Sequence, residues 1–106
     1  MARYATIDVG SHSVLLHVVE QDEAGRLQVL ADRVELSRLG DGLLRRGRLG
    51  EEAMARTIAA LGGFCRLIEE LAVEQVAAVG TMCLRRAGNS AAFVARVQRE
   101  LGLRLE

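Results

Sequence analysis

The stretch Tyr4–Glu20, YATIDVGSHSVLLHVVE, determines how the rest of the sequence is interpreted. Its two apolar runs, residues 5–9 and 14–20, are rich in Val, Ile and Leu and are joined by Gly10–Ser13, so we predict two consecutive strands. Asp8 lies at the end of the first run. A carboxylate at the exit of a buried strand, beside a loop of small hydroxyl side chains, costs free energy unless something is bound there. The stretch therefore predicts a ligand site.

The composition limits the class of protein and the kind of phosphate site. With 106 residues, of which 50% are hydrophobic and 26% charged, the chain is expected to form one soluble globular domain. Fourteen basic residues balance fourteen acidic ones, so no overall field favours nucleic acid or a membrane as partner. Every basic residue is Arg, which excludes a P-loop lysine. Any phosphate must then be bound by backbone amides and arginine.

The cysteines and the hydropathy indicate a cytoplasmic protein. Cys65 and Cys83 are too few for a disulfide framework and lack CxxC spacing, which favours reduced thiols and argues against a zinc site. No apolar run reaches 18 residues, and the N-terminus has no signal-like apolar segment. We therefore expect a cytoplasmic chain that is neither exported nor anchored.

A third strand and a long loop follow the first two strands. The turn QDEAG precedes a run from Leu27 to about Leu39, in which the apolar alternation changes parity, so we predict a bulge or bend near Asp32 and Arg33. The next segment, LGDGLLRRGRLG (39–50), has four glycines and an arginine cluster. Its composition predicts a loop.

The second half of the sequence predicts helices alternating with strands. Apolar residues at steps of three and four predict a helix from Glu51 to about Leu71, in which Gly62 and Gly63 would permit close packing against the sheet. The run Val76–Gly80 has no polar side chain and predicts a strand buried on both faces. A second helix is expected over Ser90–Leu101, before Gly102. The final LRLE begins a fifth strand.

The order β-β-β-α-β-α-β predicts an α/β fold, with an antiparallel meander continued into parallel crossovers and helices packed on a mixed sheet. This is the half-domain pattern of ribonuclease H-like and actin-like proteins. The segments IDVGSHSVLL, RLGDGL, GRLGEEAM, GTMCLRRAGN and LGLRLE follow one another as in the N-terminal part of the exopolyphosphatase and guanosine pentaphosphate phosphohydrolase (Ppx/GppA) family. The resemblance covers essentially the whole chain.

The resemblance implies an activity, a cofactor and a set of contacts. Similar proteins hydrolyse phosphoanhydrides of polyphosphate or guanosine pentaphosphate with magnesium. By the same resemblance, Gly10, Ser11, His12 and Ser13 match the first phosphate loop, where backbone amides and hydroxyls would bind phosphate. Asp8 would hold magnesium or its water. From the residues alone, a turn carboxylate that accepts loop amides is an equally good interpretation of Asp8.

Two positions of the first loop depart from the family pattern. His12 replaces the usual asparagine of GSNS and can still donate one hydrogen bond, although a lone loop histidine is more often simply exposed. Leu15 replaces an arginine found in many relatives, so one anion contact is expected to be missing. His17 is expected to be an ordinary residue of the strand surface.

A second anion contact is expected in GTMCLRRAGN. Arg85 and Asn89 match the family's LRxAxN positions at the entrance to a helix, so the resemblance implies that Arg85 contacts phosphate. Asn89 is better explained as a helix cap. Arg86 is interpreted as a solvated charge, as are Arg45, Arg46 and Arg48, whose possible role in guiding a polyanion is the weaker interpretation. Cys83 has no histidine partner in the sequence and is interpreted as structural.

The family's catalytic glutamate and second phosphate loop, implied by the resemblance, have no match in residues 1–106, so no catalytic residue is assigned. We expect this range to be an N-terminal, shortened portion of an actin-fold domain. It is expected to form a homo-oligomer through the edge of the fifth strand or through an uncovered apolar sheet face. Two alternatives stay open. One is a non-catalytic phosphate-binding or regulatory half-domain, and the other is half of an actin-like or sugar-kinase ATP-binding domain.

Overall fold

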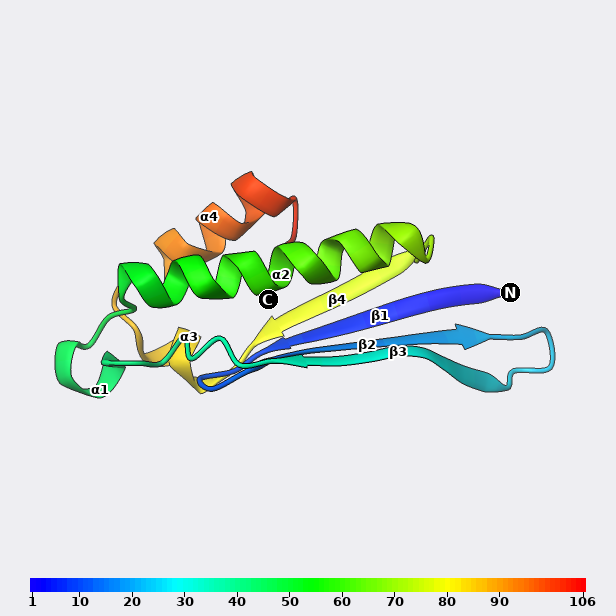
Figure 1. Ribbon diagram of the computed structural model, residues 1–106, viewed down its shortest axis with the longest axis horizontal. Coiled ribbons are helices and arrows are strands. Elements are labelled where there is room, and N and C mark those ends of the chain that lie inside the picture. The colour runs from blue at the N-terminus through cyan, green and yellow to red at the C-terminus, as the bar shows by residue number, and fades with distance from the viewer.

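The protein's computed structural model describes all 106 residues and contains one mixed sheet. Strands β1 (Ala2–Val9), β2 (Val14–Gln21) and β3 (Leu27–Glu35) form an antiparallel meander. Strand β4 (Gln75–Gly80) lies parallel to β1, so the spatial order is β3-β2-β1-β4. The predicted mixed sheet is therefore confirmed (Figure 1).

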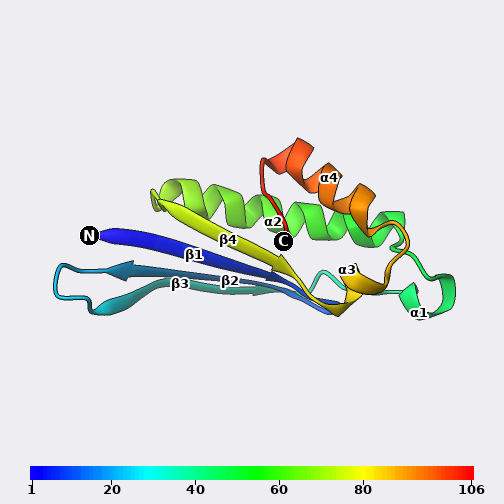
Figure 2. The same cartoon turned by 180° about the vertical axis from the view of Figure 1, so that it is seen from behind.

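Two long helices cover one face of the sheet. α2 (Glu51–Glu70) and α4 (Ser90–Leu101) lie on the same side in both views (Figures 1 and 2). Their bounds agree with the predicted helices. Each follows a strand and returns the chain across the sheet, as a parallel connection requires.

Two short helices, α1 (Leu43–Arg46) and α3 (Met82–Arg86), were not predicted. α1 is a single turn bounded by Gly42 and Gly47. Their φ angles are 77° and 70°, in the left-handed region that glycine adopts with little strain. Both helices lie at the end of the sheet where β1 and β4 finish (Figure 2). They replace part of the irregular structure that the glycine-rich segments predict.

Strand alternation places the core between the sheet and the two long helices. Ile7 and Val9 of β1 are fully buried, as are Leu16 and Val18 of β2. They pack in one cluster with side chains of both helices, including the fully buried Phe93 of α4. Since a fully buried aliphatic side chain contributes roughly 1.5–3 kcal/mol, this cluster supplies much of the driving force for folding.

The opposite face of the sheet carries no helix, and we call it the open face. It presents the residues that alternate with the core, among them the exposed Leu15, Val29, Val34 and Val79. Asp8 is exposed on the same face, between Leu15 on β2 and Val79 on β4. A sheet with one covered face explains why the strands alternate so regularly.

The third strand has the predicted irregularity but is shorter than the predicted run. The bulge lies at Leu30, near Asp32 and Arg33, because Val18 pairs with Ala31 whereas Val19 pairs with Val29. The strand also ends at Glu35. Residues 36–42, here called the connecting segment, leave the sheet because their amides and carbonyls bond to the β1–β2 loop and to α2.

The prediction that β4 is buried on both faces was wrong. Only Ala78 is buried, at 3% exposure, whereas Val76 and Val79 are each 40% exposed. β4 has β1 on one side and only the chain end on the other, and its second face belongs to the open face. An apolar run identifies a strand, but the elements that cover it lie far away in the sequence.

The prediction for the two glycines of α2 was also wrong. A Cβ at Gly62 would lie 3.6 Å from Leu101 Cδ2 of α4, and a Cβ at Gly63 would meet only the side chain of Arg66. No atom of the sheet lies within 4 Å of a Cβ at either position, although Gly63 lines the cavity between β3 and α2. Phe64 is the buried aromatic of this helix, at 4% exposure.

The predicted fifth strand is present only as an isolated bridge beside β4. Leu105 forms a parallel bridge with Ala78, Glu106 N donates to Ala78 O at 2.9 Å, and Gly80 N donates to Glu106 O at 3.0 Å. None of the four helices combines the length with the apolar character needed to cross a membrane.

Candidate phosphate-binding site

Three segments meet at the end of the sheet where β1 and β4 finish: Gly10–Ser13, the connecting segment and the start of α3. Thr81 donates to the Val9 carbonyl through both its backbone N, at 3.0 Å, and its Oγ1, at 3.2 Å. Arg38 N donates to His12 O at 3.0 Å, and Gly40 N donates to Ser11 O at 2.9 Å. The β1–β2 loop is therefore held from two sides.

In the backbone of Gly10–Ser13, here called the amide loop, the carbonyls of residues 11–13 are hydrogen-bonded but their amides are not. The carbonyls of Ser11, His12 and Ser13 all accept hydrogen bonds, the last from Gly10 N at 3.0 Å. The N–H groups of the same three residues donate to no acceptor in the protein. Since C=O and N–H point in opposite directions across a trans peptide, binding the Ser11 and His12 carbonyls turns the following amides away from the connecting segment. Consecutive free amides of this kind suit an anion.

Glycine is needed where the segments approach each other. A Cβ at Gly40 would lie 3.0 Å from Ser11 Cβ, and a Cβ at Gly10 would lie 3.1 Å from Ser13 O. The hydroxyls of Ser11 and Ser13 and the imidazole of His12 form no hydrogen bond within the chain. These side chains stay available to a ligand beside the free amides.

Beside the amide loop lies a cavity of about 320 Å³, lined by Ser11, His12, Leu44, Met82 and Arg86 among others. Arg86 forms no ion pair with any carboxylate of the chain. From the sequence, Arg86 is interpreted as a solvated charge, and its place beside the amide loop is not predicted. The direction of α3 decides which of two adjacent arginines faces the loop, and no local sequence signal identifies it.

Arg85, the predicted second contact, lines a different cavity, together with Gly80, Ser90 and Arg104. Its guanidinium is exposed and unpaired. The structure thus brings Ser11 and His12 together with Arg86 and places Arg85 on the neighbouring side of α3. A phosphate contact by Arg85 stays a prediction.

Asp8 offers one free carboxylate next to the amide loop. It is exposed, and it accepts no hydrogen bond and forms no ion pair within the chain, so the turn-carboxylate interpretation has no contact to support it. No group of three or more His, Cys, Asp or Glu side chains is assembled anywhere in the structure. Magnesium keeps several waters and often takes only one or two carboxylates together with phosphate oxygens, so a single free carboxylate fits it.

Asn89 occupies the N-cap position of α4, as predicted. Its side chain, however, makes no capping hydrogen bond. Its side chain instead bonds both backbone groups of Leu49: Leu49 N donates to Asn89 Oδ1 at 2.8 Å, and Asn89 Nδ2 donates to Leu49 O at 3.0 Å. Asn89 therefore joins the segment after α1 to the α3–α4 junction.

The remaining candidates behave as ordinary structural or surface residues. His17 is exposed on β2, with its Nδ1 3.6 Å from Asp32 Oδ1 on β3, as expected of a strand-surface pair. Arg45, Arg46 and Arg48 are exposed.

Neither cysteine has the surroundings of a nucleophile. Cys83 is 1% exposed and packs in the core. Burial raises the pKa of the half-buried Cys65 thiol, and the nearby Arg66 opposes this only in part. A raised pKa leaves little thiolate near neutral pH. The interpretation of Cys83 as structural agrees with its burial.

Comparison with known proteins gives a consistent result. Residues 18–106 match the profile of the Ppx/GppA phosphatase family. The chain is 35% identical over 103 residues to the guanosine-5'-triphosphate,3'-diphosphate pyrophosphatase of Photobacterium profundum, an alignment that covers 97% of this chain and 20% of that protein.

Solved structures resemble the whole chain. The crystal structure of the Aquifex aeolicus Ppx/GppA family member aligns with a TM-score of 0.96 at 40% identity, over 99% of this chain and 34% of that one. An exopolyphosphatase from Cytophaga hutchinsonii aligns with a TM-score of 0.94 at 29% identity, over 98% of this chain and 33% of that one. The chain thus spans about a third of these structures and a fifth of the curated relative.

Proposed function

The chain belongs to the Ppx/GppA phosphatase family. From this premise we propose that it is part of a phosphoanhydride hydrolase that acts on inorganic polyphosphate or guanosine pentaphosphate. Its part is to supply the first phosphate-binding loop. The relatives support this proposal by their names: one is a guanosine pentaphosphate pyrophosphatase and another an exopolyphosphatase.

The observation that carries the proposal is the set of three free amides at Ser11, His12 and Ser13. Each N–H that points at a phosphate oxygen forms a charge-assisted hydrogen bond, stronger than one between neutral groups. The loop needs no reorganisation to do so, because its carbonyls are already bound elsewhere. A preorganised set of donors is what a phosphoryl-transfer site requires, since its catalysis is largely positioning and electrostatic stabilisation.

Side chains around the loop complete the anion site. Ser11 and Ser13 add hydroxyl donors, and Arg86 adds a positive charge from the adjacent cavity wall. Arg85 is proposed as a second cationic contact, reached from the other side of α3. Asp8 would hold magnesium or one of its waters. Bound there, magnesium would neutralise part of the charge on the phosphate oxygens.

We assign no general base within these residues. Asp41 of the connecting segment is engaged by Arg56 at 3.3 Å and by Arg38 at 3.7 Å. Asp8 is assigned to the metal. Residues 1–106 are therefore proposed to bind phosphate and magnesium without supplying the base that activates water.

The test is Asp8→Asn, compared with the wild-type chain in its binding of magnesium pyrophosphate. Titration followed at the backbone amides should shift Ser11, His12 and Ser13 first. We expect Asp8→Asn to weaken magnesium-dependent binding about tenfold, which corresponds to about 1.4 kcal/mol, and to leave the melting temperature nearly unchanged. In a protein that contains this chain and hydrolyses phosphoanhydrides, Asp8→Asn should lower the turnover rate by a similar factor or more.

The matched control is Asp32→Asn, which removes an exposed carboxylate from the same face of the sheet. It should bind magnesium pyrophosphate as the wild type does. Amide shifts confined to residues outside the amide loop would contradict the proposed site. A large loss of stability in Asp8→Asn with binding preserved would favour a structural turn role for Asp8.

A further inference from the structure

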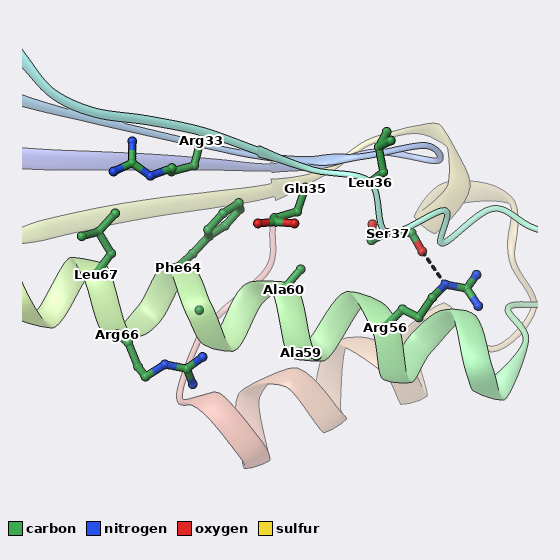
Figure 3. Close-up of a pocket in the computed structure, with 11 residues that line it drawn as sticks. Arg33, Glu35, Leu36, Ser37, Arg56, Ala59, Ala60, Phe64, Arg66 and Leu67 are labelled. Carbon is green, nitrogen blue, oxygen red and sulfur yellow. Dashed lines mark hydrogen bonds between the residues drawn. The ribbon is translucent and has the colours of Figure 1, made fainter.

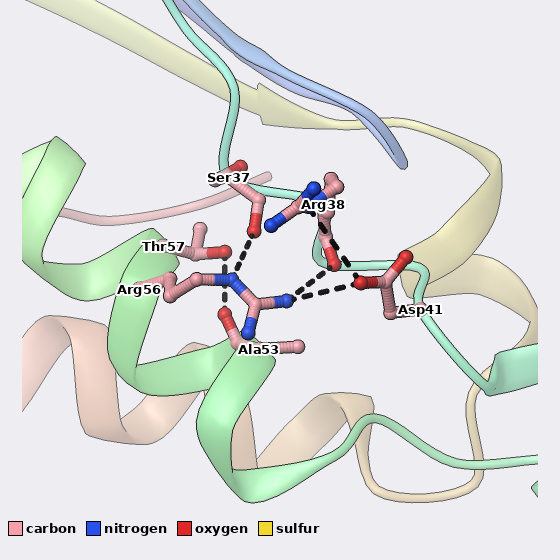
Figure 4. A network of polar contacts seen from close by, with 6 residues as sticks. All are labelled: Ser37, Arg38, Asp41, Ala53, Arg56 and Thr57. Carbon is pink, nitrogen blue, oxygen red and sulfur yellow. Dashed lines mark hydrogen bonds and ion pairs between the residues drawn. The ribbon is translucent and has the colours of Figure 1, made fainter.

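Arg56 of α2 holds the connecting segment from the side opposite the amide loop. Its Nε donates to Ser37 O at 3.0 Å, and its Nη2 donates to Arg38 O at 3.2 Å and to Asp41 Oδ2 at 3.3 Å (Figure 4). One guanidinium thus binds two successive carbonyls and a carboxylate. The fixed fork of donors makes arginine suited to several acceptors at once.

The peptide groups bound by Arg56 also contact the amide loop. Ser37 C=O and Arg38 N–H belong to one peptide group, which accepts from Arg56 and donates to His12 O at 3.0 Å. His12 C=O and Ser13 N–H belong to the next group in this series. A line of hydrogen bonds therefore runs from the Arg56 guanidinium through two peptide groups to the free N–H of Ser13.

Two physical effects favour phosphate binding at the end of this line. First, fixing the 37–38 peptide fixes the 12–13 peptide, so the Ser13 N–H is oriented before ligand arrives. Second, hydrogen-bonded peptide groups polarise one another, and a positive charge at the carbonyl end makes the terminal N–H a stronger donor. Arg56 can orient and polarise the Ser13 N–H in this way from the far side of the connecting segment.

We propose that Arg56 is a positioning residue for the amide loop, which sets the direction and donor strength of the Ser13 amide through the 37–38 peptide. This inference rests on the proposed function of the loop. It assigns a binding role to a residue of α2 that lies on the far side of the connecting segment.

The ion pair with Asp41 does not explain the placement of Arg56. The Asp41 side chain is 61% exposed, and exposed pairs of this kind contribute about 0–1 kcal/mol. Ser37, in contrast, is 2% exposed, and its carbonyl makes a partly buried hydrogen bond with Arg56. This carbonyl belongs to the peptide group that donates to His12 O.

Arg66 provides a matched control on the same helix. Both arginines line the cavity of about 580 Å³ between β3 and α2, together with Arg33, Glu35, Ser37 and Phe64 (Figure 3). Arg66 forms neither an ion pair nor a hydrogen bond to the connecting segment. Arg56→Gln and Arg66→Gln therefore remove the same charge from the same helix and differ in the contact under test.

The first measurement needs no ligand. Arg56→Gln should increase the exchange rate of the Arg38 amide with solvent about tenfold relative to the wild type, because the 37–38 peptide loses its anchor. The amides of the β1–β2 ladder should exchange as before, which shows that the sheet stays folded. An unchanged Arg38 amide would overturn the positioning role, whatever the loop binds.

The second measurement uses pyrophosphate with magnesium as the probe. We expect Arg56→Gln to raise the dissociation constant about five- to tenfold, and Arg66→Gln to raise it less than about twofold. Arg56→Lys, which keeps the charge but loses the fork, should give an intermediate value. Asp41→Asn should bind like the wild type, since it leaves both carbonyl contacts in place.

The outcomes separate the two proposals. Equal losses in Arg56→Gln and Arg66→Gln would reduce the effect to net charge and overturn the inference. If Arg56→Gln fails to fold, Arg56→Lys decides, because binding equal to that of the wild type would overturn the role of the fork. A wild-type chain whose Ser11–Ser13 amides do not respond to pyrophosphate would overturn the proposed function, while the ligand-free exchange rates would still test how Arg56 holds the 37–38 peptide.

Discussion

At the residue scale, peptide orientation matters more in the amide loop than side-chain identity. The His12 side chain is exposed and has no partner within the chain. Its peptide groups nevertheless make the same kind of contacts as those of Ser11, through carbonyls bound to Gly40 and Arg38. An exchange of side chain at this position is tolerable because the backbone supplies the donors.

Leu15 shows the opposite case, in which the side chain itself matters. It pairs directly with Asp8 across β1 and β2 and is 41% exposed on the open face. An arginine at this position would lie beside the Asp8 carboxylate, within reach of a bound anion. The leucine leaves this part of the site without a cationic contact.

Ser37 carries a prediction about stability. It is 2% exposed, and its Oγ is the one buried side-chain polar atom without a hydrogen-bond partner, whereas the buried Thr57 Oγ1 donates to Ala53 O at 2.8 Å. Because an unsatisfied buried hydroxyl costs about 1–3 kcal/mol, Ser37→Ala should raise the free energy of unfolding by about 1 kcal/mol. Denaturant unfolding measures the change. A loss of stability would indicate that the hydroxyl has a partner, such as a buried water.

At the element scale, the placement of α3 depends on a glycine at the end of β4. A Cβ at Gly80 would overlap the Leu84 side chain, lying 2.9 Å from its Cγ and 3.2 Å from its Cβ. The close approach holds the turn that presents Arg85 and Arg86 against the end of the strand. Glycine is thus required for packing at this position, where no positive φ demands it.

Gly80→Ala should destabilise the protein by about 1–3 kcal/mol, since Leu84 or the whole of α3 must move. The control is Gly63→Ala in α2, where the nearest atom to a new Cβ is Arg66 Nη2 at 3.7 Å. This second change should stabilise by about 1 kcal/mol, because alanine is the better helix former. Chemical denaturation measures both variants. Equal stability of Gly80→Ala and wild type, with unchanged amide shifts over residues 81–86, would contradict the packing argument.

At the scale of the whole molecule, the sheet has one covered and one open face. The open face presents Leu27, Val29 and Val34 at 65%, 55% and 59% exposure, with Leu15 and Val79 beside them. Apolar side chains gathered on a flat surface favour association with another surface. The free edge of β3 borders the same region and adds unpaired backbone groups.

We therefore expect the 106-residue chain to self-associate at micromolar concentration through the open face. Sedimentation should show a species larger than the monomer, and the double change Val29→Thr with Val34→Thr should shift the population to monomer. The control is Leu44→Thr in α1, which removes an apolar side chain that is 89% exposed away from the sheet. A wild-type chain that sediments only as a monomer would contradict this expectation, and association unaffected by the valine changes would point to a strand edge instead.

The sequence alone determined the order of the four strands and the two long helices, the bounds of α2 and α4 and the position of the amide loop. These follow from local causes: the period of apolar residues, glycine at helix ends and a turn of small residues after Asp8. The family resemblance, and with it the α/β fold, could likewise be predicted from ordered segments of the chain.

Only the tertiary structure decided which faces are covered and which groups meet. The exposure of β4, the choice of Arg86 over Arg85 at the loop, the bond of Asn89 to Leu49 and the line from Arg56 to Ser13 were not predictable. Each depends on contacts between residues far apart in sequence, whose directions are set by packing. Periodicity reports the side of an element that is apolar, but the partner that covers that side, and the peptide group that a side chain reaches, are determined only when the chain is assembled.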